Sequence, residues 1–461
     1  MDADGTPLTP EETHSAFELL RRMTPAHDLM QLAPTGPAAI YTTLVTLWML
    51  TLQRLSGGAS IAAVVKTVLT HSRNMLPNNK RVREETLSKN SGAYSEARRR
   101  LPIKAVELFA NSVCNSLIER TPTWFGDRRA YILDGTTLTL SPTSELTAVF
   151  PPATNQYGVT VWPVLMILVV HELQSGCALI PEIGAMYGPD NTSEAKQAIA
   201  IAKRLPPRSL VMADSGHGIF SVSFAMSSQG HTILFRLTKS RYKALRRDAE
   251  LIDSNETSTM HRLHWKPSPK DRQTNPDLPV DAELHVMLHQ VELESGDQLM
   301  LVTTTQYSSQ EAAEAYSRRY DVEHDIRDLK VTLGLEKIRA RTKEMVQKEI
   351  LCSIVAYNLL LEFRRDAAKV AKLPPRRLSF TGVWNTFEIF LLHQPPCSPS
   401  DWHQRYENAL KIAATDKLPN RPGRSFPRKA HPRRPKSTKF MKKVAQEKKP
   451  KNEVTAKPPP K

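Results

Sequence analysis

Three carboxylates stand out in this sequence by the places that they occupy. Asp134 interrupts a hydrophobic, strand-like run, "RAYILDGTTLTL", and Asp214 ends another, "SLVMAD". A carboxylate in or at the end of a buried strand is costly unless it is paired or binds a cation. Gly135 follows Asp134 directly and Gly216 follows Asp214 by two residues, which is typical of a side chain that projects from a sheet into an open site. The third carboxylate, Glu323, lies in a charged helical stretch.

That stretch, "YSRRYDVEHDIRDLK" at residues 316–330, holds four acidic and four basic residues among fifteen. Tyr316, Arg319, Glu323 and Lys330 are offset by 0, 3, 7 and 14 residues. On one continuous helix they would share an arc of about 60°, beside the apolar stripe. From periodicity alone, a solvated surface of i,i+4 ion pairs such as Arg319 with Glu323 is the favoured interpretation. The stripe comprises Val322, Ile326, Leu329 and Leu333, while Asp321, Asp325 and Asp328 point elsewhere.

The first 125 residues are predicted to be helical. An apolar helix stops at Gly57 and Gly58, and Ser60 is a candidate N-cap for "IAAVVKTVLTH". Two helices joined by a short glycine-containing turn can be a helix-turn-helix that docks on DNA or a plain helical hairpin. Both interpretations stay open. A further basic helix is expected in "SEARRRLPIKAVELFANSVCNSLIER".

The pattern changes to strands after residue 124. The order is three strands, a helix, a strand, a helix and a strand, which predicts a mixed sheet with helices packed on it. The strands are expected in "RAYILDGTTLTL", "VTVWPVLMILVVHEL", "CALIPEIGAMYG", "SLVMADSGH" and "HTILFRL".

Residues 238–307 then form a polar, proline-containing insertion, mostly β or loop, that ends in a hairpin around Ser295 and Gly296. The next helix begins at Ser308, with Glu311 completing a capping box, and is expected to carry residues 316–330. Another long helix follows it.

The formal net charge of +16 suggests a polyanionic partner. Residues 421–461 hold fifteen Lys and Arg against two Glu, so the first 420 residues carry only +3. This tail has too few apolar residues to fold alone and is expected to be disordered. No apolar run reaches the roughly 18 residues of a membrane span, and the acidic N-terminus does not look like a signal peptide. The four cysteines form no CxxC pair and are expected to be buried thiols.

The residues of the motifs resemble those of a known family. "DGTTLTLSPTSEL", "VMADSGHGIF" and above all Y-x2-R-x3-E-x6-K at Tyr316, Arg319, Glu323 and Lys330 are similar to the DDE transposases of bacterial insertion sequences, the insertion-sequence-four family. The resemblance runs from about residue 91 to 360. It implies an α/β fold: a ribonuclease-H-like mixed sheet with helices, interrupted by a mostly β insertion and flanked by helical N- and C-terminal regions.

The family organisation assigns a role to each region. The expected parts are a helical DNA-recognition region at 1–125, a catalytic domain at 126–370 with the insertion at about 238–307, a helical C-terminal region at 371–420, and a disordered basic tail at 421–461.

The resemblance also assigns residues. It implies that Asp134, Asp214 and Glu323 are the catalytic, metal-binding triad for two Mg²⁺ ions, for which Mn²⁺ can substitute. Tyr316, Arg319 and Lys330 would hold phosphates of the cleaved DNA end, and Arg236 is a weaker match to a DNA-contacting arginine. The remaining charged residues of the stretch, Arg327 being a borderline case, are expected to be solvated.

Two aromatic residues have competing interpretations. Trp265 could stack on a flipped base, as an aromatic residue of the family insertion does, or it could pack the core of the insertion. His217, three residues after Asp214, could support that carboxylate or have no role.

The implied function is cut-and-paste transposition: binding of transposon ends, strand cleavage, and strand transfer into target DNA. The partners would be double-stranded DNA and a second copy of the chain in the synaptic complex, with no membrane and a cytoplasmic, nucleoid-associated location. Two alternatives remain, a nuclease of the same fold without strand transfer, and a non-catalytic DNA-binding repressor or inhibitor of transposition.

Overall fold

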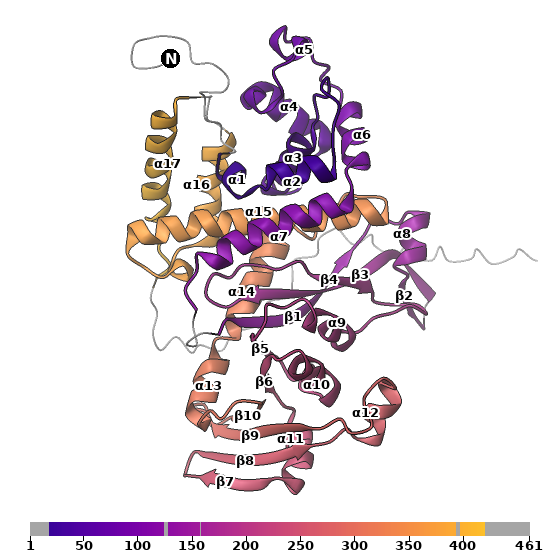
Figure 1. Ribbon diagram of the computed structural model, residues 1–461, viewed down its shortest axis with the longest axis vertical. Coiled ribbons are helices and arrows are strands. Elements are labelled where there is room, and N and C mark those ends of the chain that lie inside the picture. The colour runs from indigo at the N-terminus through magenta and orange to yellow at the C-terminus, as the bar shows by residue number, and fades with distance from the viewer. Residues whose placement is uncertain (1–17, 124–127, 157, 393–396, 420–461) are drawn as a thin grey trace, which may run out of the picture. The chain divides into compact units, whose positions relative to one another are not determined.

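A computed structural model describes residues 18–123, 128–156, 158–392 and 397–419 of the chain (Figure 1). Its centre is a ten-stranded mixed sheet. The strands are β1 (Ala130–Thr139), β2 (Pro152–Asn155), β3 (Gly158–Glu172), β4 (Glu182–Ala185), β5 (Leu210–Ala213), β6 (Thr232–Arg236), β7 (Glu250–Ser254), β8 (Ser258–Trp265), β9 (Leu284–Glu292) and β10 (Gln298–Thr303).

Five strands form the ribonuclease-H-like part of the sheet. β1, β3 and β4 are antiparallel neighbours, and β5 and β6 then add in parallel on the other side of β1. The resulting order is β4–β3–β1–β5–β6, so three antiparallel strands are followed along the chain by two that need crossover helices. The predicted fold class is confirmed.

The insertion continues this sheet. β10 pairs antiparallel with the free edge of β6, and β9, β8 and β7 follow in turn. The predicted hairpin around Gly296 is the turn between β9 and β10, where Gly296 has a φ of +79°. The β7–β8 hairpin was not predicted, although β8 alternates exposed and buried residues from Arg262 to Trp265 as an edge-side strand should.

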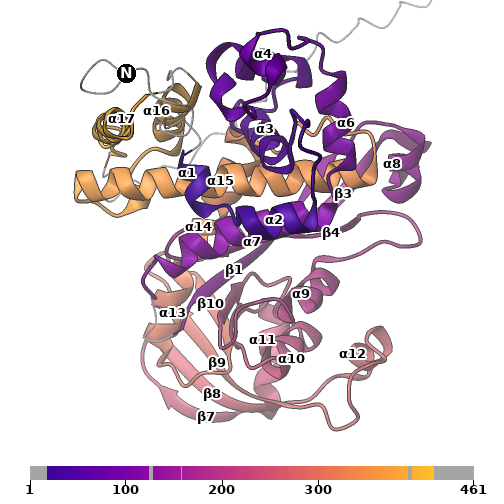
Figure 2. The same cartoon turned by 45° about the horizontal axis from the view of Figure 1, so that its top comes forward.

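Helices cover both faces of the sheet (Figure 2). α9 (Glu194–Ala202) and α10 (Phe220–Ser228) contact one face, and α13 (Ser309–Ser317) and α14 (Tyr320–Arg327) contact the other. Side chains of β1 separate accordingly. Ala130 and Ile132 share a core with α13 and α14, whereas Tyr131 and Leu133 belong to the larger core on the opposite side.

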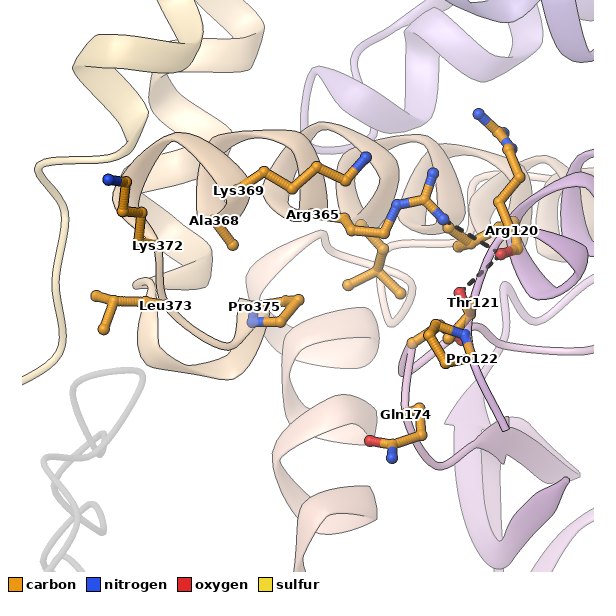
Figure 3. Close-up of a pocket in the computed structure, with 13 residues that line it drawn as sticks. Arg120, Thr121, Pro122, Gln174, Arg365, Ala368, Lys369, Lys372, Leu373 and Pro375 are labelled. Atoms are coloured by element: carbon orange, nitrogen blue, oxygen red, sulfur yellow. Dashed lines mark hydrogen bonds between the residues drawn. The ribbon is translucent and has the colours of Figure 1, made fainter. Parts of the chain in front are cut away.

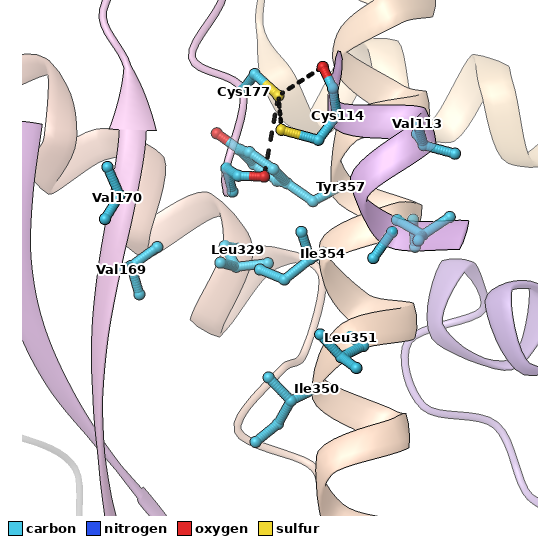
Figure 4. Packing of buried hydrophobic residues seen from close by; sticks show 14 of the residues in the cluster. Val113, Cys114, Val169, Val170, Cys177, Leu329, Ile350, Leu351, Ile354 and Tyr357 are labelled. Atoms are coloured by element: carbon cyan, nitrogen blue, oxygen red, sulfur yellow. Dashed lines mark hydrogen bonds between the residues drawn. The ribbon is translucent and has the colours of Figure 1, made fainter. Parts of the chain in front are cut away.

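The larger core is organised by α15 (Lys343–Ala371), a helix of 29 residues. α7 (Ile103–Glu119) and α3 (Thr43–Leu55) pack along it. In Figure 4, Ile350, Ile354 and Tyr357 of α15 lie between α7 and β3. Cys114 and Cys177 are buried there with their sulfur atoms 3.4 Å apart, and all four cysteines are free thiols, as predicted.

The remaining helices flank these elements. They are α1 (Glu18–Met23), α2 (Ala26–Leu32), α4 (Ile61–His71), α5 (Lys80–Arg83), α6 (Gly92–Arg100), α8 (Ser144–Val149), α11 (Lys239–Leu245), α12 (Pro269–Thr274), α16 (Phe380–Leu392) and α17 (Pro399–Ala413), with short turns η1 (Arg73–Met75), η2 (Arg246–Asp248) and η4 (Pro375–Arg377). Ser60 caps α4 as predicted, by accepting a hydrogen bond from the Ala63 N–H. The basic helix expected from residue 95 onward is instead two helices, because Pro102 cannot continue α6.

The helix expected to carry residues 316–330 is also interrupted. It begins as predicted, with the Ser308 and Glu311 capping box, but α13 stops at Ser317. Tight i→i+3 hydrogen bonds replace the helical ladder, for example from the Val322 N–H to the Arg319 carbonyl. After α14 the chain widens into a π-helical turn, η3 (Asp328–Thr332). The single 60° arc was therefore the wrong geometry, because it assumed one continuous helix.

Some expectations lie outside the described residues. The basic tail at 421–461 and the start of the chain at 1–17 are among them. Within the described ranges, none of the helices has the length and apolar character needed to cross a membrane.

Candidate active site

The sheet itself brings Asp134 and Asp214 together. β1 and β5 are adjacent parallel strands in which Ile132 is the register partner of Met212. Each aspartate lies two residues beyond that pair, on the face that points toward α13 and α14. Adjacent strands lie about 4.8 Å apart, so the two carboxylates begin from neighbouring positions, Asp134 in the middle of β1 and Asp214 just past the end of β5. The side chain of Asp214 is 42% exposed, and that of Asp134 is partly buried.

α14 supplies the third carboxylate. Its residue Val322 and residue Tyr316 of α13 share the small core on this face of the sheet, so the break between the two helices keeps both anchored. Glu323 follows Val322 and points outward, with half of its side chain exposed. The helix thus presents a solvent-accessible carboxylate on the same face of the sheet as Asp134 and Asp214.

Arg319 is the cation that these carboxylates share. Its Nη2 donates to Glu323 Oε1 at 2.8 Å. Burial alone would lower the pKa of Arg319, but its proximity to Tyr316, Glu323 and Asp134 outweighs that effect and raises the pKa. Arg319 also lowers the pKa of both Asp134 and Asp214. Arg319 is therefore ion-paired with Glu323 and acts electrostatically on the two aspartates of β1 and of the loop after β5.

Asp134 has a pKa above its usual value. Burial raises its pKa; Arg319 and the Gly135 N–H act against that rise, and Asp214 and Glu194 add to it. Glu194 opens α9 and lies over Gly135, where a Cβ atom would collide with its carboxylate. A side chain at residue 135 would therefore displace the Glu194 carboxylate.

The environment of Asp214 is different because His217 supports it. His217 is buried, and its Nδ1 lies 3.0 Å from Asp214 Oδ1. This hydrogen bond is the main cause that lowers the pKa of Asp214 to about 2. The Gly216 N–H donates to the same oxygen. Of the two interpretations of His217, the structure favours support of Asp214; the Asp-x-x-His spacing across a tight turn was the signal.

A second residue that the sequence did not reveal holds the same loop. Arg241 of α11 donates through Nη1 to the carbonyls of Ser215 and Gly218, both at 2.9 Å. Gly218 packs on the Arg236 carbonyl so closely that a Cβ would collide with it. The start of the insertion therefore fixes the turn that follows Asp214.

The other residues of the four-residue signature lie on the same face. Lys330 Nζ donates to the Thr136 hydroxyl at 2.9 Å, two residues beyond Asp134 on β1. The Tyr316 hydroxyl is buried, and no partner for it is found in the described part of the chain. Burial raises the pKa of Tyr316, and Arg319 and Arg236 lower it, which shows that both cations are near. Arg236 itself is exposed at the end of β6.

Trp265 is placed elsewhere. Its side chain is 5% exposed and belongs to the core on the opposite face of the sheet. Its ring packs edge-on against Phe220 of α10, with centroids 5.6 Å apart. Stacking on a base would require the ring to leave this core, so the geometry favours the packing interpretation.

The prediction of a solvated face is wrong for two of the remaining charges. Asp325 is 2% exposed and is held by Arg376, and Asp328 is also buried. Arg376 comes from η4, beyond the end of α15, so no local pattern around residue 325 could have indicated it.

The donor chemistry of the triad fits a hard divalent cation, because all three residues offer carboxylate oxygens. Within the described ranges, however, no three carboxylate, histidine or cysteine side chains lie close enough together to hold an ion. Glu323 is instead paired with Arg319, the positive charge that neutralises the acids here.

The triad lies on an accessible surface, and a pocket that is partly open to solvent lies elsewhere. A cavity of about 530 Å³ is found at the C-terminal end of α15 (Figure 3). Its lining includes Arg120, Arg365, Lys369 and Lys372 and none of the three carboxylates. An open, partly exposed acidic site suits a polymeric substrate better than a small enclosed one.

Comparison with known proteins shows the family of this chain. The model of the transposase DDE domain family matches residues 125–359, about half of the chain and the part that contains β1, β5, α14 and all three carboxylates. The chain belongs to this family of transposases, enzymes that act on DNA by transposition.

Two individual proteins are similar to it. Transposase InsG for insertion sequence element IS4 of Escherichia coli (strain K12) is 23% identical over 344 residues, which are 72% of this chain and 73% of that protein. A cryo-EM structure of a piggyBac transposase synaptic complex with hairpin DNA is 10% identical, covers 92% of this chain and 88% of its own, and gives a TM-score of 0.40. That structural similarity is too low to transfer any property.

Proposed function

We propose that this protein is a cut-and-paste DNA transposase that binds transposon ends, cleaves them and transfers the strands into target DNA. The observation that carries the proposal is that Asp134 and Asp214 start from adjacent strands while Glu323 is ion-paired with Arg319, all within the family-matched region. Acids that repel DNA phosphate have no use in a protein that only binds DNA.

The chain's own cations would hold the phosphates of the cleaved end. Arg319 is 12% exposed, and its bond to Glu323 uses one of five N–H donors, so it retains capacity for a phosphate oxygen. Lys330 would add a point charge beside β1, and the Tyr316 hydroxyl would find there the partner that it lacks. Arg236 would contact the same DNA from the end of β6.

Asp134, Asp214 and Glu323 would hold two Mg²⁺ ions, or Mn²⁺ in their place. When bound, such ions supply activation of the attacking oxygen and stabilisation of the leaving 3′ oxygen. The protein contributes the arrangement of the donors: His217 and the Gly216 N–H orient Asp214, and the Gly135 N–H donates to Asp134 Oδ1 at 2.9 Å.

Recognition of DNA would fall to the helical region at 1–125, as the family organisation implies. α4 and α6 present exposed cations there, among them Lys66, Arg99 and Arg100. Joining two ends implies that two copies of the chain act together on DNA.

The test is a cleavage and strand-transfer assay on DNA that carries the ends of the encoding element, with Mg²⁺ present. Glu323→Ala should lower cleavage at least 100-fold, on the order of what loss of a principal catalytic group costs. Glu314→Ala is the matched control, because Glu314 is exposed on α13 and lies outside the site. Cleavage that survives Glu323→Ala would refute the assignment.

The same assay separates the alternatives. Wild-type cleavage without joining would favour a nuclease of this fold. Specific binding without any cleavage would favour a repressor or inhibitor of transposition.

A further inference from the structure

α14, the helix that carries Glu323, is short and has few intrahelical hydrogen bonds. It has eight residues. The helical hydrogen-bond pattern is interrupted just before it, and the π-helical turn η3 follows directly. Eight residues span only about 12 Å, and isolated helices of this length are not stable in water. Its position must therefore come from tertiary contacts, and the site requires that position to be accurate.

Arg376 makes the most extensive of those contacts. Its Nη1 and Nη2 donate to the two carboxylate oxygens of Asp325 at 2.6 and 2.8 Å, which is the bidentate arrangement. Its Nε lies 3.5 Å from Asp321 Oδ2. Nη2 also reaches the Leu173 carbonyl, 3.2 Å away. Leu173 follows β3 and donates its N–H to the Ala130 carbonyl at the start of β1.

The placement of the two aspartates explains why this contact concerns Glu323. Asp321 and Asp325 are i,i+4 neighbours, so they lie on one side of α14. Glu323 lies midway between them in sequence, and two residues correspond to about 200° of rotation, which puts it on the opposite side. Arg376 thus binds the side of α14 that is opposite to the side from which Glu323 projects.

The ion pair of Arg376 with Asp325 is also buried in the core. Asp325 is 2% exposed, and His171 of β3 has its Nδ1 4.0 Å from Asp325 Oδ2. Gly176 lies against the pair with a φ of +73°, and a Cβ there would be 3.3 Å from Arg376 Nη2. Glycine at position 176 therefore fits both the backbone conformation and the close approach of the Arg376 guanidinium.

We propose that Arg376 is a positioning residue that holds α14, and with it Glu323, at a fixed place relative to the strand that carries Asp134. Arg376 lies beyond residue 359, where the family match ends, and it touches none of the triad. This inference rests on the proposed catalytic role of Glu323. It assigns a positioning function to the turn η4 of the C-terminal region.

The test compares Arg376→Gln and Arg376→Lys with Arg377→Gln in the full-length protein. Arg377 is the matched control on the same turn, where its Nη2 donates to the Leu418 carbonyl at 3.1 Å. Single-turnover cleavage is measured at saturating DNA, below the melting temperature of each variant. Arg376→Gln should cleave about 100-fold more slowly, because displacement by about 1 Å costs that much. Affinity for DNA should change less than about twofold, and Arg377→Gln should match wild type.

Hydrogen exchange supplies a readout that needs neither metal nor DNA. The amides of residues 320–327 should exchange faster in Arg376→Gln than in wild type, while those of α15 should not change. Arg376→Lys keeps the charge without the fork, and it should fall between the two in both measurements.

A double variant separates positioning from stability. Arg376→Gln alone leaves a buried carboxylate unpaired and can lower stability severely. Asp325→Asn together with Arg376→Gln removes that charge, so the melting temperature should recover while cleavage stays slow. If cleavage recovers with stability, or if α14 exchange is unchanged in Arg376→Gln, the inference is wrong. Wild type that fails to cleave would instead refute the proposed function.

Discussion

At the scale of single residues, the charged stretch at 316–330 separates into groups with different partners. Arg319, Glu323 and Lys330 face the sheet edge that holds the aspartates. Asp321 and Asp325 face Arg376 on the other side of α14. A sequence of alternating charges therefore encodes two sets of contacts on one short stretch, one at the exposed proposed site and one buried against Arg376.

The Tyr316 hydroxyl leads to a prediction that distinguishes stability from binding. It is buried, and no partner for it is found in the described residues, so Tyr316→Phe removes a polar group that contributes nothing to the free protein. The free energy of unfolding should stay within about 1 kcal/mol of wild type or rise. Affinity for a cleaved end should fall about tenfold, since a hydrogen bond to a phosphate is lost.

Chemical denaturation and titration with cleaved-end DNA measure the two quantities. Tyr320→Phe is the control, because Tyr320 is 64% exposed. Equal affinity of Tyr316→Phe and wild type would exclude a phosphate contact by this hydroxyl.

At the scale of elements, the insertion and the catalytic part of the sheet form one structure. β9 is joined to the first turn of α13 by a hydrogen bond between His289 Nδ1 and the Ser309 hydroxyl, 3.1 Å apart. His289 is fully buried, and burial lowers its pKa to about 4. An element that was expected to be a separate insertion thus contacts the helix that leads to Glu323.

This histidine predicts acid sensitivity. Its pKa in the folded protein lies below the value of about 6.5 in the unfolded chain, so the unfolded state binds the proton first as pH falls. Stability should be intact above pH 6.5 and decrease toward pH 4. Between pH 7.5 and 5 the loss due to His289 should be about 2 kcal/mol. His289→Asn should abolish this part of the pH dependence, measured by urea unfolding at the two pH values.

His285→Asn provides the comparison, because the His285 side chain is 67% exposed on the same strand. It should keep the wild-type dependence on pH. A His289→Asn protein that still loses the same free energy would show that another group titrates.

The elements also show what the sequence could and could not predict. The strands around Asp134 and Asp214, the Ser308 capping box and the β9–β10 turn were predicted because each depends on neighbouring residues. The break at Arg319 was not, since it is set by anchoring Tyr316 and Val322 in a core made by distant strands. Contacts across long separations, such as Arg376 with Asp325, leave no local pattern.

At the scale of the whole molecule, the charge is divided between a nearly neutral body and a strongly basic end. The described residues place the acidic site at a sheet edge lined by a few specific cations. Those cations can position a DNA end, but most of the net charge of +16 lies in residues 421–461. The proposed site and most of the positive charge thus belong to different parts of the chain.

The tail therefore predicts how binding responds to salt. Residues 421–461 carry fifteen Lys and Arg against two Glu, and each phosphate that they neutralise adds about 0.9 to the slope of log affinity against log salt. Deleting the tail should flatten this slope by several units and weaken binding at physiological salt. Cleavage at low salt should persist, because the triad and its supporting residues lie before residue 419. A full-length variant with the tail Lys and Arg changed to Gln separates charge from chain length and should behave like the deletion. Slopes that are identical with and without the tail, measured by equilibrium binding from 50 to 300 mM salt, would contradict a role in DNA attraction and leave solubility as its function.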